Sequence, residues 1–367
     1  MHTDKRNKRI ELLEILNHAK IAGTERHVLL LATNLDNNLF NTSICTFENG
    51  DLVNNLKKNI NIKTKVISYR KRFIHFYRLI KFLRNSNFDL IHSHSGGYAC
   101  IAGKIAGIRR IIYTKHGVGF TKKELDNLNI KTKISSIVVD KCVNHYIALT
   151  KNDKNTLIKY FKIKPNKISV IPNGIDISFI DNVKKEESKE IIIGTVTRLM
   201  PQKGLKYFIK AIPRILNYNS KINFKIAGTG SQKGELVLLA NNLKIKNKID
   251  FSGYITDVAN YINNLDIFIL PSIWEGFPYV LLEAMILKKP IITTDIFGIN
   301  EIIKNNHQGI LVKPYNHKQI ADSVIKLLKD SKLARYLGES AYRKVLKNYT
   351  LDKNVKSIQS LYLKILK

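Results

Sequence analysis

The sequence predicts an α/β protein of two domains, each built on a parallel sheet. Short apolar runs alternate with helical patterns along most of its 367 residues, as in successive βαβ units. That length leaves room for two domains of ordinary size. A polar, charge-rich stretch at 181–190 interrupts the alternation and predicts a linker.

Each apolar run is short enough for one buried strand and is followed by a helical pattern or a turn. In the first half the expected strands are Ile10–Leu16, Ser43–Phe47, Lys65–Ile67, Leu90–Ser93, Arg110–Thr114, His145–Leu149 and Ile168–Ile171. In the second half they are Ile191–Thr197, Ile222–Ala227, Ile249–Ser252, Asp266–Leu270, Ile291–Thr294 and Gly309–Val312. Helical stretches follow at 316–329, 331–346 and 351–366.

The composition is that of a soluble globular protein, with 44% hydrophobic and 25% charged residues. The net charge of +32 predicts attraction to polyanions. Because Lys, Asn and Ile are abundant throughout and no nucleic-acid motif occurs, we expect no nucleic-acid partner. The cysteines, Cys45, Cys100 and Cys142, lack zinc-site spacing, which favours a reducing compartment, and we expect Cys100 and Cys142 to be buried.

No apolar run approaches the roughly 18 residues that span a bilayer. The basic N-terminus leads into a segment with Glu11 and Glu14 instead of the apolar core of a signal peptide. We therefore expect a cytoplasmic protein, soluble or peripheral at the inner face of the cytoplasmic membrane.

Residues 69–84 contain no acid and several aromatics. At helical spacing their apolar side chains form one stripe flanked by Arg and Lys (Phe73, Phe76, Tyr77, Ile80 and Leu83). Such a helix suits an anionic membrane surface. A helix packed on the sheet with a solvated basic face explains the pattern equally well.

The most informative stretch is Leu270–Met285, in which a buried strand ends at Pro271 and a helix resumes near Pro278. Ligands of open α/β sheets bind at the carboxyl ends of strands, beside helix N-termini. The amides of Gly276, Phe277 and Tyr279 would therefore face an anion. Pro278, in the same turn, has no amide hydrogen. Two carboxylates, Glu275 and Glu283, frame this loop and could accept hydrogen bonds from hydroxyls, so the stretch predicts a nucleotide sugar.

Two other strand ends of the second half carry residues suited to a nucleoside diphosphate. Arg198 can grip two phosphate oxygens, and Lys203 adds a point charge in the same strand-to-helix turn. Gly228 belongs to a glycine-rich turn, which alone is a weak signal. Tyr254 follows a further strand end.

In the first half, strand ends carry a glycine turn and histidines. Gly23 and Thr24 stand at the turn after the first strand, where glycine permits close approach of a ligand. His92 and His94 end one strand, and His116 ends the next. We expect His92 to be structural, and His116 and His94 to line a site.

Together these motifs resemble those of retaining GT-B glycosyltransferases, most closely family four (glycosyl transferases group 1). Glu275 and Glu283 match its E-x7-E signature within Pro-Ser-x-x-Glu-Gly-Phe, and Arg198 and Lys203 match its Arg-x4-Lys-Gly site. Thr-x-His-Gly around His116, and Pro-Asn-Gly-x-Asp at 172–176, also match. Ala22 replaces the first glycine of the family's Gly-Gly-x-Glu-Arg loop.

The resemblance implies a GT-B fold: two Rossmann-like domains facing a central cleft. It implies an acceptor-binding domain at 1–175, a linker at 176–190 and a nucleotide-sugar domain at 191–348. A C-terminal helix, 349–367, would cross back to the first domain.

The resemblance also implies roles. Glu283 holds the ribose, and Glu275 with the amides of 276–279 holds hydroxyls of the donor sugar. Arg198 and Lys203 stabilise the leaving diphosphate, while Gly228 and Tyr254 line the nucleotide pocket. On the acceptor side lie Gly23, Thr24 and His94, with His116 beside the sugar. Glu275, His116, Arg198 and Lys203 are the candidate catalytic residues.

The implied reaction is transfer of a sugar from a UDP- or GDP-sugar to a glycan or lipid-linked acceptor, with retention, in bacterial polysaccharide or lipopolysaccharide synthesis. No Asp-x-Asp occurs, so we expect neither metal nor other cofactor. A nucleotide-sugar epimerase on the same fold stays open as an alternative.

Overall fold

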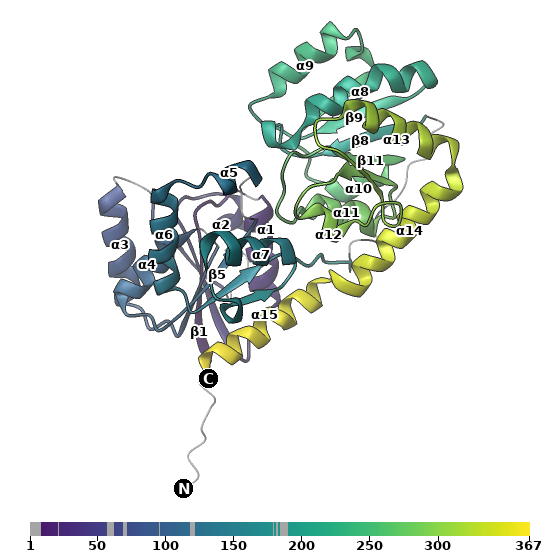
Figure 1. The fold of residues 1–367 in the computed structure, drawn as a ribbon. Coiled ribbons are helices and arrows are strands. Elements are labelled where there is room, and N and C mark those ends of the chain that lie inside the picture. Colours follow the sequence, from purple (N-terminus) through teal and green to yellow (C-terminus); the bar gives the residue numbers. More distant parts are fainter. Residues whose placement is uncertain are drawn as a thin grey trace. The chain divides into compact units, whose positions relative to one another are not determined.

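The computed structural model describes residues 9–20, 22–56, 62–68, 72–94, 96–117, 122–178, 180, 183 and 190–367. It divides into two compact units (Figure 1). Unit 1 comprises Met1–Gly174 and Leu351–Lys367, and unit 2 comprises Ile175–Thr350. Most of the predicted linker lies outside the described residues, so each unit is treated by itself.

Unit 1 is built on a parallel sheet with the strand order β3-β2-β1-β4-β5-β6-β7. The order reverses between β1 and β4, which is the switch point of a Rossmann-like sheet. The strands are β1 (Ile10–Leu16), β2 (Phe40–Thr46), β3 (Lys63–Val66), β4 (Leu90–Ser93), β5 (Arg110–Lys115), β6 (His145–Ala148) and β7 (Ile168–Val170). The predicted strands are therefore present, with ends shifted by up to three residues.

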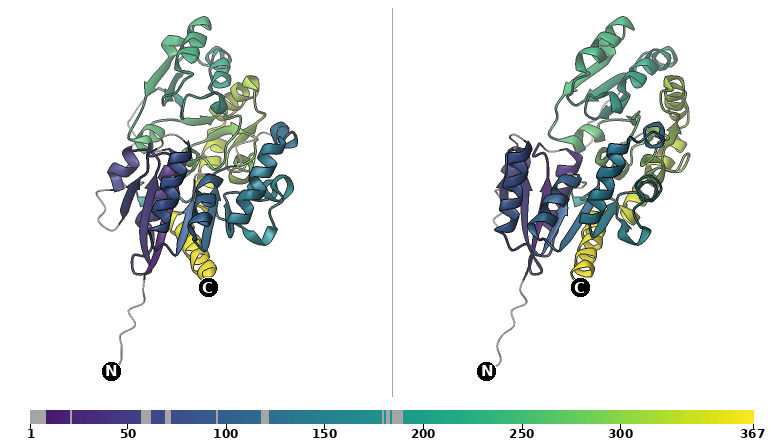
Figure 2. Two further views of the ribbon diagram at one scale, coloured as in Figure 1. Left: turned by 90° about the vertical axis from the view of Figure 1, so that its left-hand side faces the viewer. Right: turned by 60° about the vertical axis from the view of Figure 1, so that its left-hand side comes forward.

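Helices cover both faces of this sheet (Figure 2). Leu13 and Ile15 of β1 pack in one apolar cluster with α3, α4, α6 and α7. Leu12, on the opposite face, packs with α1 and α15. The helices are α1 (Gly23–Asn34), α2 (Asp51–Leu56), α3 (Arg72–Arg84), α4 (Gly97–Ala106), α5 (Lys122–Asp126), α6 (Ile130–Cys142), α7 (Lys151–Phe161) and α15 (Leu351–Leu366), with a 3-10 turn at Pro165–Lys167.

Unit 2 repeats the same plan, with the parallel strand order β10-β9-β8-β11-β12-β13. Its switch point lies between β8 and β11. The strands are β8 (Ile192–Val196), β9 (Asn223–Ala227), β10 (Ile249–Gly253), β11 (Ile267–Leu270), β12 (Ile291–Thr294) and β13 (Ile310–Val312). The helices are α8 (Leu205–Tyr218), α9 (Lys233–Asn242), α10 (Val258–Asn263), α11 (Tyr279–Ile286), α12 (Ile299–Ile302), α13 (His317–Lys329) and α14 (Ser331–Asn348).

Helix α15 belongs to unit 1, as predicted for the C-terminal helix. Its apolar residues Val355, Ile358 and Leu361 pack in one cluster with Leu12 of β1 and Ile112 of β5. The chain therefore enters unit 2 after Gly174 and returns to unit 1 at Leu351. None of the helices in the described part of the chain is long and apolar enough to cross a membrane.

Two predictions about side chains were partly wrong. The predicted stripe of α3 divides, because Leu83 is buried, whereas Phe73 is 87% and Tyr77 66% exposed. The core packs against one side of the helix only. The apolar residues of α3 therefore divide between a buried side and a solvent-exposed side. Cys100 is buried, but Cys142, in the last turn of α6, is only partly buried.

Candidate functional site

The switch point of unit 2 brings two predicted residues into direct contact. The turn after β8 carries Lys203, and the turn after β11 carries Glu275. Lys203 Nζ lies 2.6 Å from Glu275 Oε1, with side-chain exposures of 10% and 7%. Ser272 donates a second hydrogen bond to the same carboxylate oxygen, at 2.7 Å. Both charged groups are nearly buried, so water screens them little. The attraction between Lys203 and Glu275 at this strand end is therefore strong.

Glycine makes this close approach of two turns possible. Gly204 follows Lys203 with φ +64, and a Cβ there would lie 2.1 Å from the carbonyl oxygen of Pro271. The amide of Ile273 donates to the carbonyl of Gln202 at 2.7 Å, which joins the two turns. A side chain at position 204 would separate Lys203 from Glu275.

The turn after β11 continues into α11 with mostly buried residues. Phe277, Tyr279 and Glu283 are each under 10% exposed, and Pro278 is the N-cap of α11. Gly298, with φ +88, approaches so closely that a Cβ would lie 2.2 Å from the carbonyl oxygen of Gly276. The loop is therefore held from two sides, as a binding loop needs to be.

The predicted nucleotide wall lies at the ends of β8, β9 and β10. The amide of Gly228 donates to the carbonyl of Gly253, and a Cβ at Gly228 would lie 1.9 Å from the carbonyl oxygen of Thr197. Tyr254 is 69% exposed. Arg198 is also exposed, and its guanidinium makes no ion pair with a described carboxylate. Both side chains are available to a ligand.

In unit 1 a chain of polar side chains begins at the buried Glu14 on β1 and ends at His116, which is partly exposed. Glu14 Oε2 lies 2.6 Å from His94 Nε2, and His94 Nδ1 lies 2.8 Å from His116 Nε2. Tyr362 of α15 donates to the other oxygen, Glu14 Oε1, at 2.8 Å. The structure thus brings the predicted pair His94 and His116 together.

His92 is structural, as predicted. It is fully buried and lies opposite Glu14 in the register of β1 and β4. Its Nδ1 lies 2.5 Å from the Tyr362 hydroxyl, and its Nε2 lies 2.7 Å from the Thr114 hydroxyl. Both ring nitrogens are therefore occupied.

Burial controls the protonation of this chain. Burial and then His92 lower the pKa of His94 to about 4. Burial, and then His94 and His27, hold the pKa of His116 well below its usual range. Burial disfavours the Glu14 carboxylate, but its interactions with His92 and His94 outweigh burial and lower its pKa. At neutral pH the chain therefore holds an ionised carboxylate and neutral imidazoles.

Glu14, His92 and His94 each offer one ligand atom, within 4.8 Å of one another. Two ligands on a tetrahedral zinc ion stand about 3.3 Å apart, given bonds of about 2 Å. The 2.6 Å between Glu14 and His94 is a hydrogen-bond distance. The group is therefore arranged as a hydrogen-bonded network.

The predicted loop residues Gly23 and Thr24 form the first turn of α1. Ala22 is its N-cap, and the Glu25 carboxylate accepts from the Ala22 amide at 3.2 Å. Glu25 therefore caps the start of α1. Gly23 is exposed, and a Cβ added there would meet no atom within 4 Å, so a ligand could approach it.

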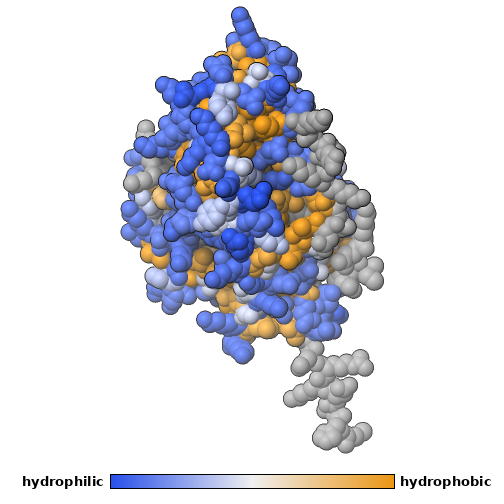
Figure 3. Space-filling view, turned by 90° about the vertical axis from the view of Figure 1, so that its right-hand side faces the viewer, coloured by the Kyte–Doolittle hydropathy of each residue, from blue (hydrophilic) through white to orange (hydrophobic). Residues whose placement is uncertain are grey.

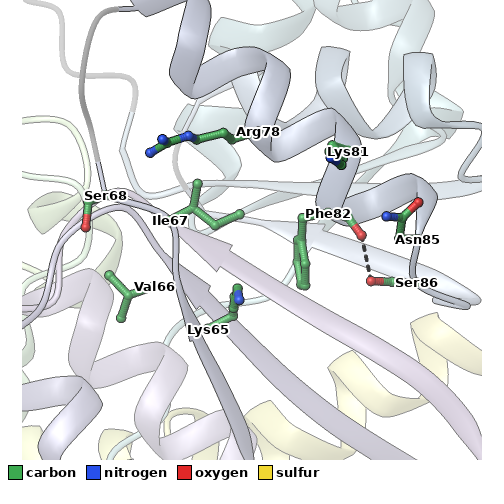
Figure 4. Close-up of a pocket in the computed structure, with 9 residues that line it drawn as sticks. All are labelled: Lys65, Val66, Ile67, Ser68, Arg78, Lys81, Phe82, Asn85 and Ser86. Carbon is green, nitrogen blue, oxygen red and sulfur yellow. Dashed lines mark hydrogen bonds between the residues drawn. The ribbon is translucent and has the colours of Figure 1, made fainter.

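A cavity of about 620 Å³ lies between β3 and α3 and contains none of the predicted site residues (Figure 4). Three cations line it, Lys65, Arg78 and Lys81, together with Phe82 and polar side chains. No carboxylate is among its lining residues.

The sequence alone did not indicate Glu14, His27 and Tyr362 as parts of the site in unit 1, or Ser272 as part of the site in unit 2. His27 is 2% exposed, and its ring lies 5.5 Å from that of His94 and 5.2 Å from that of His116. The available signal was Glu14 itself, since a carboxylate inside an apolar strand must have buried partners.

Two family models match the chain. The model described as Glycosyltransferase Family 4 matches residues 21–179, and the model described as Glycosyl transferases group 1 matches residues 176–344. The first covers much of unit 1 and the second most of unit 2.

Two similar proteins match this chain over most of its length. An Escherichia coli protein, UDP-Gal:alpha-D-GlcNAc-diphosphoundecaprenol alpha-1,3-galactosyltransferase, is 28% identical over 381 residues, covering 97% of each chain. A Campylobacter jejuni protein, N,N'-diacetylbacillosaminyl-diphospho-undecaprenol alpha-1,3-N-acetylgalactosaminyltransferase, is 27% identical over 312 residues, covering 79% of this chain and 80% of its own.

Among solved structures, Anabaena HepE in complex with UDP-glucose has a TM-score of 0.83 at 18% identity, covering 97% of this chain and 100% of that chain. This likeness shows the fold, two Rossmann-like domains. The two family models, which between them match residues 21–344, identify the chain as a glycosyltransferase similar to family four.

Proposed function

We propose that the protein transfers a sugar from a UDP-sugar to a lipid-linked or glycan acceptor, with retention of anomeric configuration. Residues 191–348, within unit 2, would bind the donor. Residues 1–175 and 349–367, which correspond closely to unit 1, would bind the acceptor, with 176–190 as the linker. The observation that supports this most is the buried Lys203–Glu275 pair at the switch point of unit 2. A lysine there can meet a diphosphate, and a carboxylate can accept from sugar hydroxyls.

The proposed chemistry is charge stabilisation of the leaving group. The bond between the anomeric carbon and the diphosphate oxygen breaks, and the acceptor oxygen bonds the same face of that carbon. The hydroxyl proton passes to the departing diphosphate. Arg198 and Lys203 stabilise the developing charge, and loss of one such donor typically costs roughly 3–4 kcal/mol of transition-state stabilisation.

Other residues position the donor. Glu283 would bind the ribose diol, while Glu275 and the amides of Gly276, Phe277 and Tyr279, in the turn that includes Pro278, would bind the sugar. Gly228 and Tyr254 would line the base pocket. On the acceptor side stand Gly23, Thr24 and His94, with His116 presented to the reacting hydroxyl. Since two cations serve the diphosphate, we propose that no metal is required.

The donor and acceptor classes are proposed by analogy with the relatives. The Escherichia coli relative is named for UDP-Gal and a diphosphoundecaprenol acceptor, and the Campylobacter relative for a diphospho-undecaprenol acceptor. A GDP-sugar stays the second candidate donor. The proposed setting is bacterial cell-surface polysaccharide or lipopolysaccharide assembly, at the inner face of the cytoplasmic membrane.

A lipid-linked acceptor requires access to a membrane surface, and we propose that α3, within 69–84, supplies it. Phe73 and Tyr77 are exposed on a helix without acids, and Arg78 and Lys81 stand beside the cavity of Figure 4. Hydrophilic residues cover much of the face drawn in Figure 3, with hydrophobic areas between them. Aromatic side chains among cations are what distinguishes α3, and they favour anionic lipid.

The test of the proposed function is nucleotide binding followed by transfer. Thermal shifts with UDP, GDP, ADP and CMP, with and without Mg²⁺, should show one stabilising nucleotide, because ligand at 100 times its Kd adds about 2.7 kcal/mol. Glu283→Ala should abolish that shift. No shift with any nucleotide would remove the ground for the proposal.

A transfer assay then tests the catalytic roles. Arg198→Ala should lower turnover about 10²–10³-fold, whereas Arg335→Ala, which removes another exposed arginine of unit 2, should not. Wild-type turnover by Arg198→Ala would refute the assignment. Incubation with donor alone tests the epimerase alternative, since only an epimerase interconverts the nucleotide sugar without an acceptor.

Membrane contact has a separate test, flotation with liposomes. Phe73→Ser/Tyr77→Ser should release the protein from anionic vesicles, and Tyr336→Ser, which removes an exposed tyrosine of α14, should not. Equal flotation with neutral and anionic vesicles would contradict the proposal.

A further inference from the structure

Glu14 lies at the start of a hydrogen-bonded chain that ends at a predicted site residue. It is fully buried, and its two oxygens contact different partners. Oε2 contacts His94 Nε2, and Oε1 accepts from Tyr362. His94 in turn contacts His116 through its other ring nitrogen. A change at Glu14 can therefore reach His116 through one intermediate ring.

The direction of each hydrogen bond follows from the charge on Glu14. An ionised carboxylate only accepts, so His94 must carry its proton at Nε2. A neutral imidazole has one proton, which leaves a lone pair at His94 Nδ1. The 2.8 Å contact to His116 Nε2 then requires the proton on His116 Nε2. His116 Nδ1 is left with a lone pair and has no partner among the described residues.

The reverse arrangement requires one more proton, on His94 or on Glu14. Burial lowers the pKa of His94 to about 4, which disfavours a doubly protonated His94 at neutral pH and leaves a protonated Glu14 as the remaining possibility. The hydroxyl of Glu14 would then donate to His94 Nε2, His94 would donate to His116, and His116 would carry its proton at Nδ1. His94 and His92 both stabilise the ionised carboxylate and lower the pKa of Glu14, which disfavours that state. Tyr362 also donates to Glu14, and so favours the ionised form.

We propose that Glu14 and His94 are positioning residues that fix the tautomer of His116, so that His116 Nδ1 accepts a hydrogen bond from a substrate hydroxyl. The inference rests on the proposed function for the identity of that substrate. Neither Glu14 nor His94 touches substrate in this scheme. The packing of His27 against both rings holds their planes in place.

The first test needs no substitution. Nitrogen NMR of the full chain with labelled histidine distinguishes protonated from bare ring nitrogens, and His116→Gln assigns the His116 signals by their loss. We expect His116 to be protonated at Nε2 and bare at Nδ1 at pH 7.5. A proton at Nδ1 in the wild-type protein would overturn the proposal.

The second test reverses the direction of the hydrogen bonds between Glu14, His94 and His116. Glu14→Gln keeps the shape but adds an amide that can donate to His94 Nε2, which moves the His116 proton to Nδ1. We expect this variant to show that tautomer and to lose about 10²-fold in kcat. Its Kd for UDP, measured by titration, should equal that of the wild type, because donor binding resides in unit 2.

Tyr362→Phe is the matched control, since it removes the hydrogen bond to the other oxygen of Glu14 in the same buried site. It should lower the melting temperature and leave the His116 tautomer unchanged, because His92 and His94 still favour the ionised form of Glu14. If Tyr362→Phe and Glu14→Gln moved the tautomer and kcat equally, the effect would be general destabilisation and the proposal would fail. A wild-type protein with the expected tautomer but no sugar transfer would overturn the proposed function alone.

Discussion

Unit 1 should lose stability steeply when the pH falls from 7 to 5, because five of its described histidines have lowered pKa values. Burial lowers the pKa of His75 and of His145, and the other three form one cluster. These are His27, His94 and His116. Burial lowers each pKa in the folded state, whereas the unfolded chain keeps a value near 6.5. The unfolded state therefore binds more protons in this window, and stability falls with falling pH.

His94 sets the scale, with a pKa of about 4 in the folded state. At pH 5 the unfolded chain gains about 2 kcal/mol from protonating this one residue. His27 and His116 act in the same direction, so the upper bound for the three is about 6 kcal/mol. Glu14 adds nothing between pH 7 and 5, because its lowered pKa matters only below about 4.5. A loss of this size is comparable with the whole stability of many domains.

Hydrogen exchange read by mass spectrometry measures the effect in each unit separately. After correction for the intrinsic pH dependence of exchange, the amides of β1 and β4 should open more readily at pH 5 than at pH 7. The amides of β8 and β11 serve as the reference, since all three histidines lie in unit 1. Unchanged opening of β1 and β4 would refute the reasoning. His27→Phe should lower by one the number of protons taken up when these strands open.

The remaining predictions concern unit 2. Lys203→Met leaves the nearly buried Glu275 without its cation and should cost about 3–5 kcal/mol in urea unfolding; adding Glu275→Gln should recover most of it, and no recovery would contradict a charge effect. Gly204→Ala should cost about 2 kcal/mol or more, because φ is +64 and a Cβ would lie 2.1 Å from the Pro271 carbonyl oxygen. Gly234→Ala in α9, with open space around it, should instead add about 1 kcal/mol; equal effects of the two changes would refute this.

Strands were predictable because buried parallel strands are continuous apolar runs. Leu90–Ser93 and Ile291–Thr294 were predicted with the bounds that the structure has. β2 begins at Phe40, three residues before the predicted Ser43. The prediction missed this start because Asn41 is polar and interrupts the apolar run, although it belongs to the strand. Its amide donates to the Glu11 carboxylate at 2.8 Å on the neighbouring strand. A single sequence does not reveal such a cross-strand pair.

The residues of unit 2 were predictable as a set, but their contact was not. Lys203 and Glu275 stand 72 positions apart, and their pairing depends on β8 and β11 being neighbours. The sequence predicts that both follow strands. It does not give the strand order, which alone brings the two turns together. Their roles toward a ligand, like the division into acceptor and donor domains, stay predictions.

Glu14 shows most clearly why the site in unit 1 was harder to predict. Its partner Tyr362 lies 348 positions away, on a helix whose apolar pattern indicated packing alone. Tyr362 is fully buried, accepts from His92 and donates to Glu14, so α15 contributes polar contacts as well as apolar surface. The return of the chain to unit 1 therefore completes the network that holds His94 and His116. If α15 were only a packing element, Tyr362→Leu would cost no more than its lost contacts; the structure implies a larger cost, because the buried Glu14 carboxylate and His92 would each lose a hydrogen-bond partner.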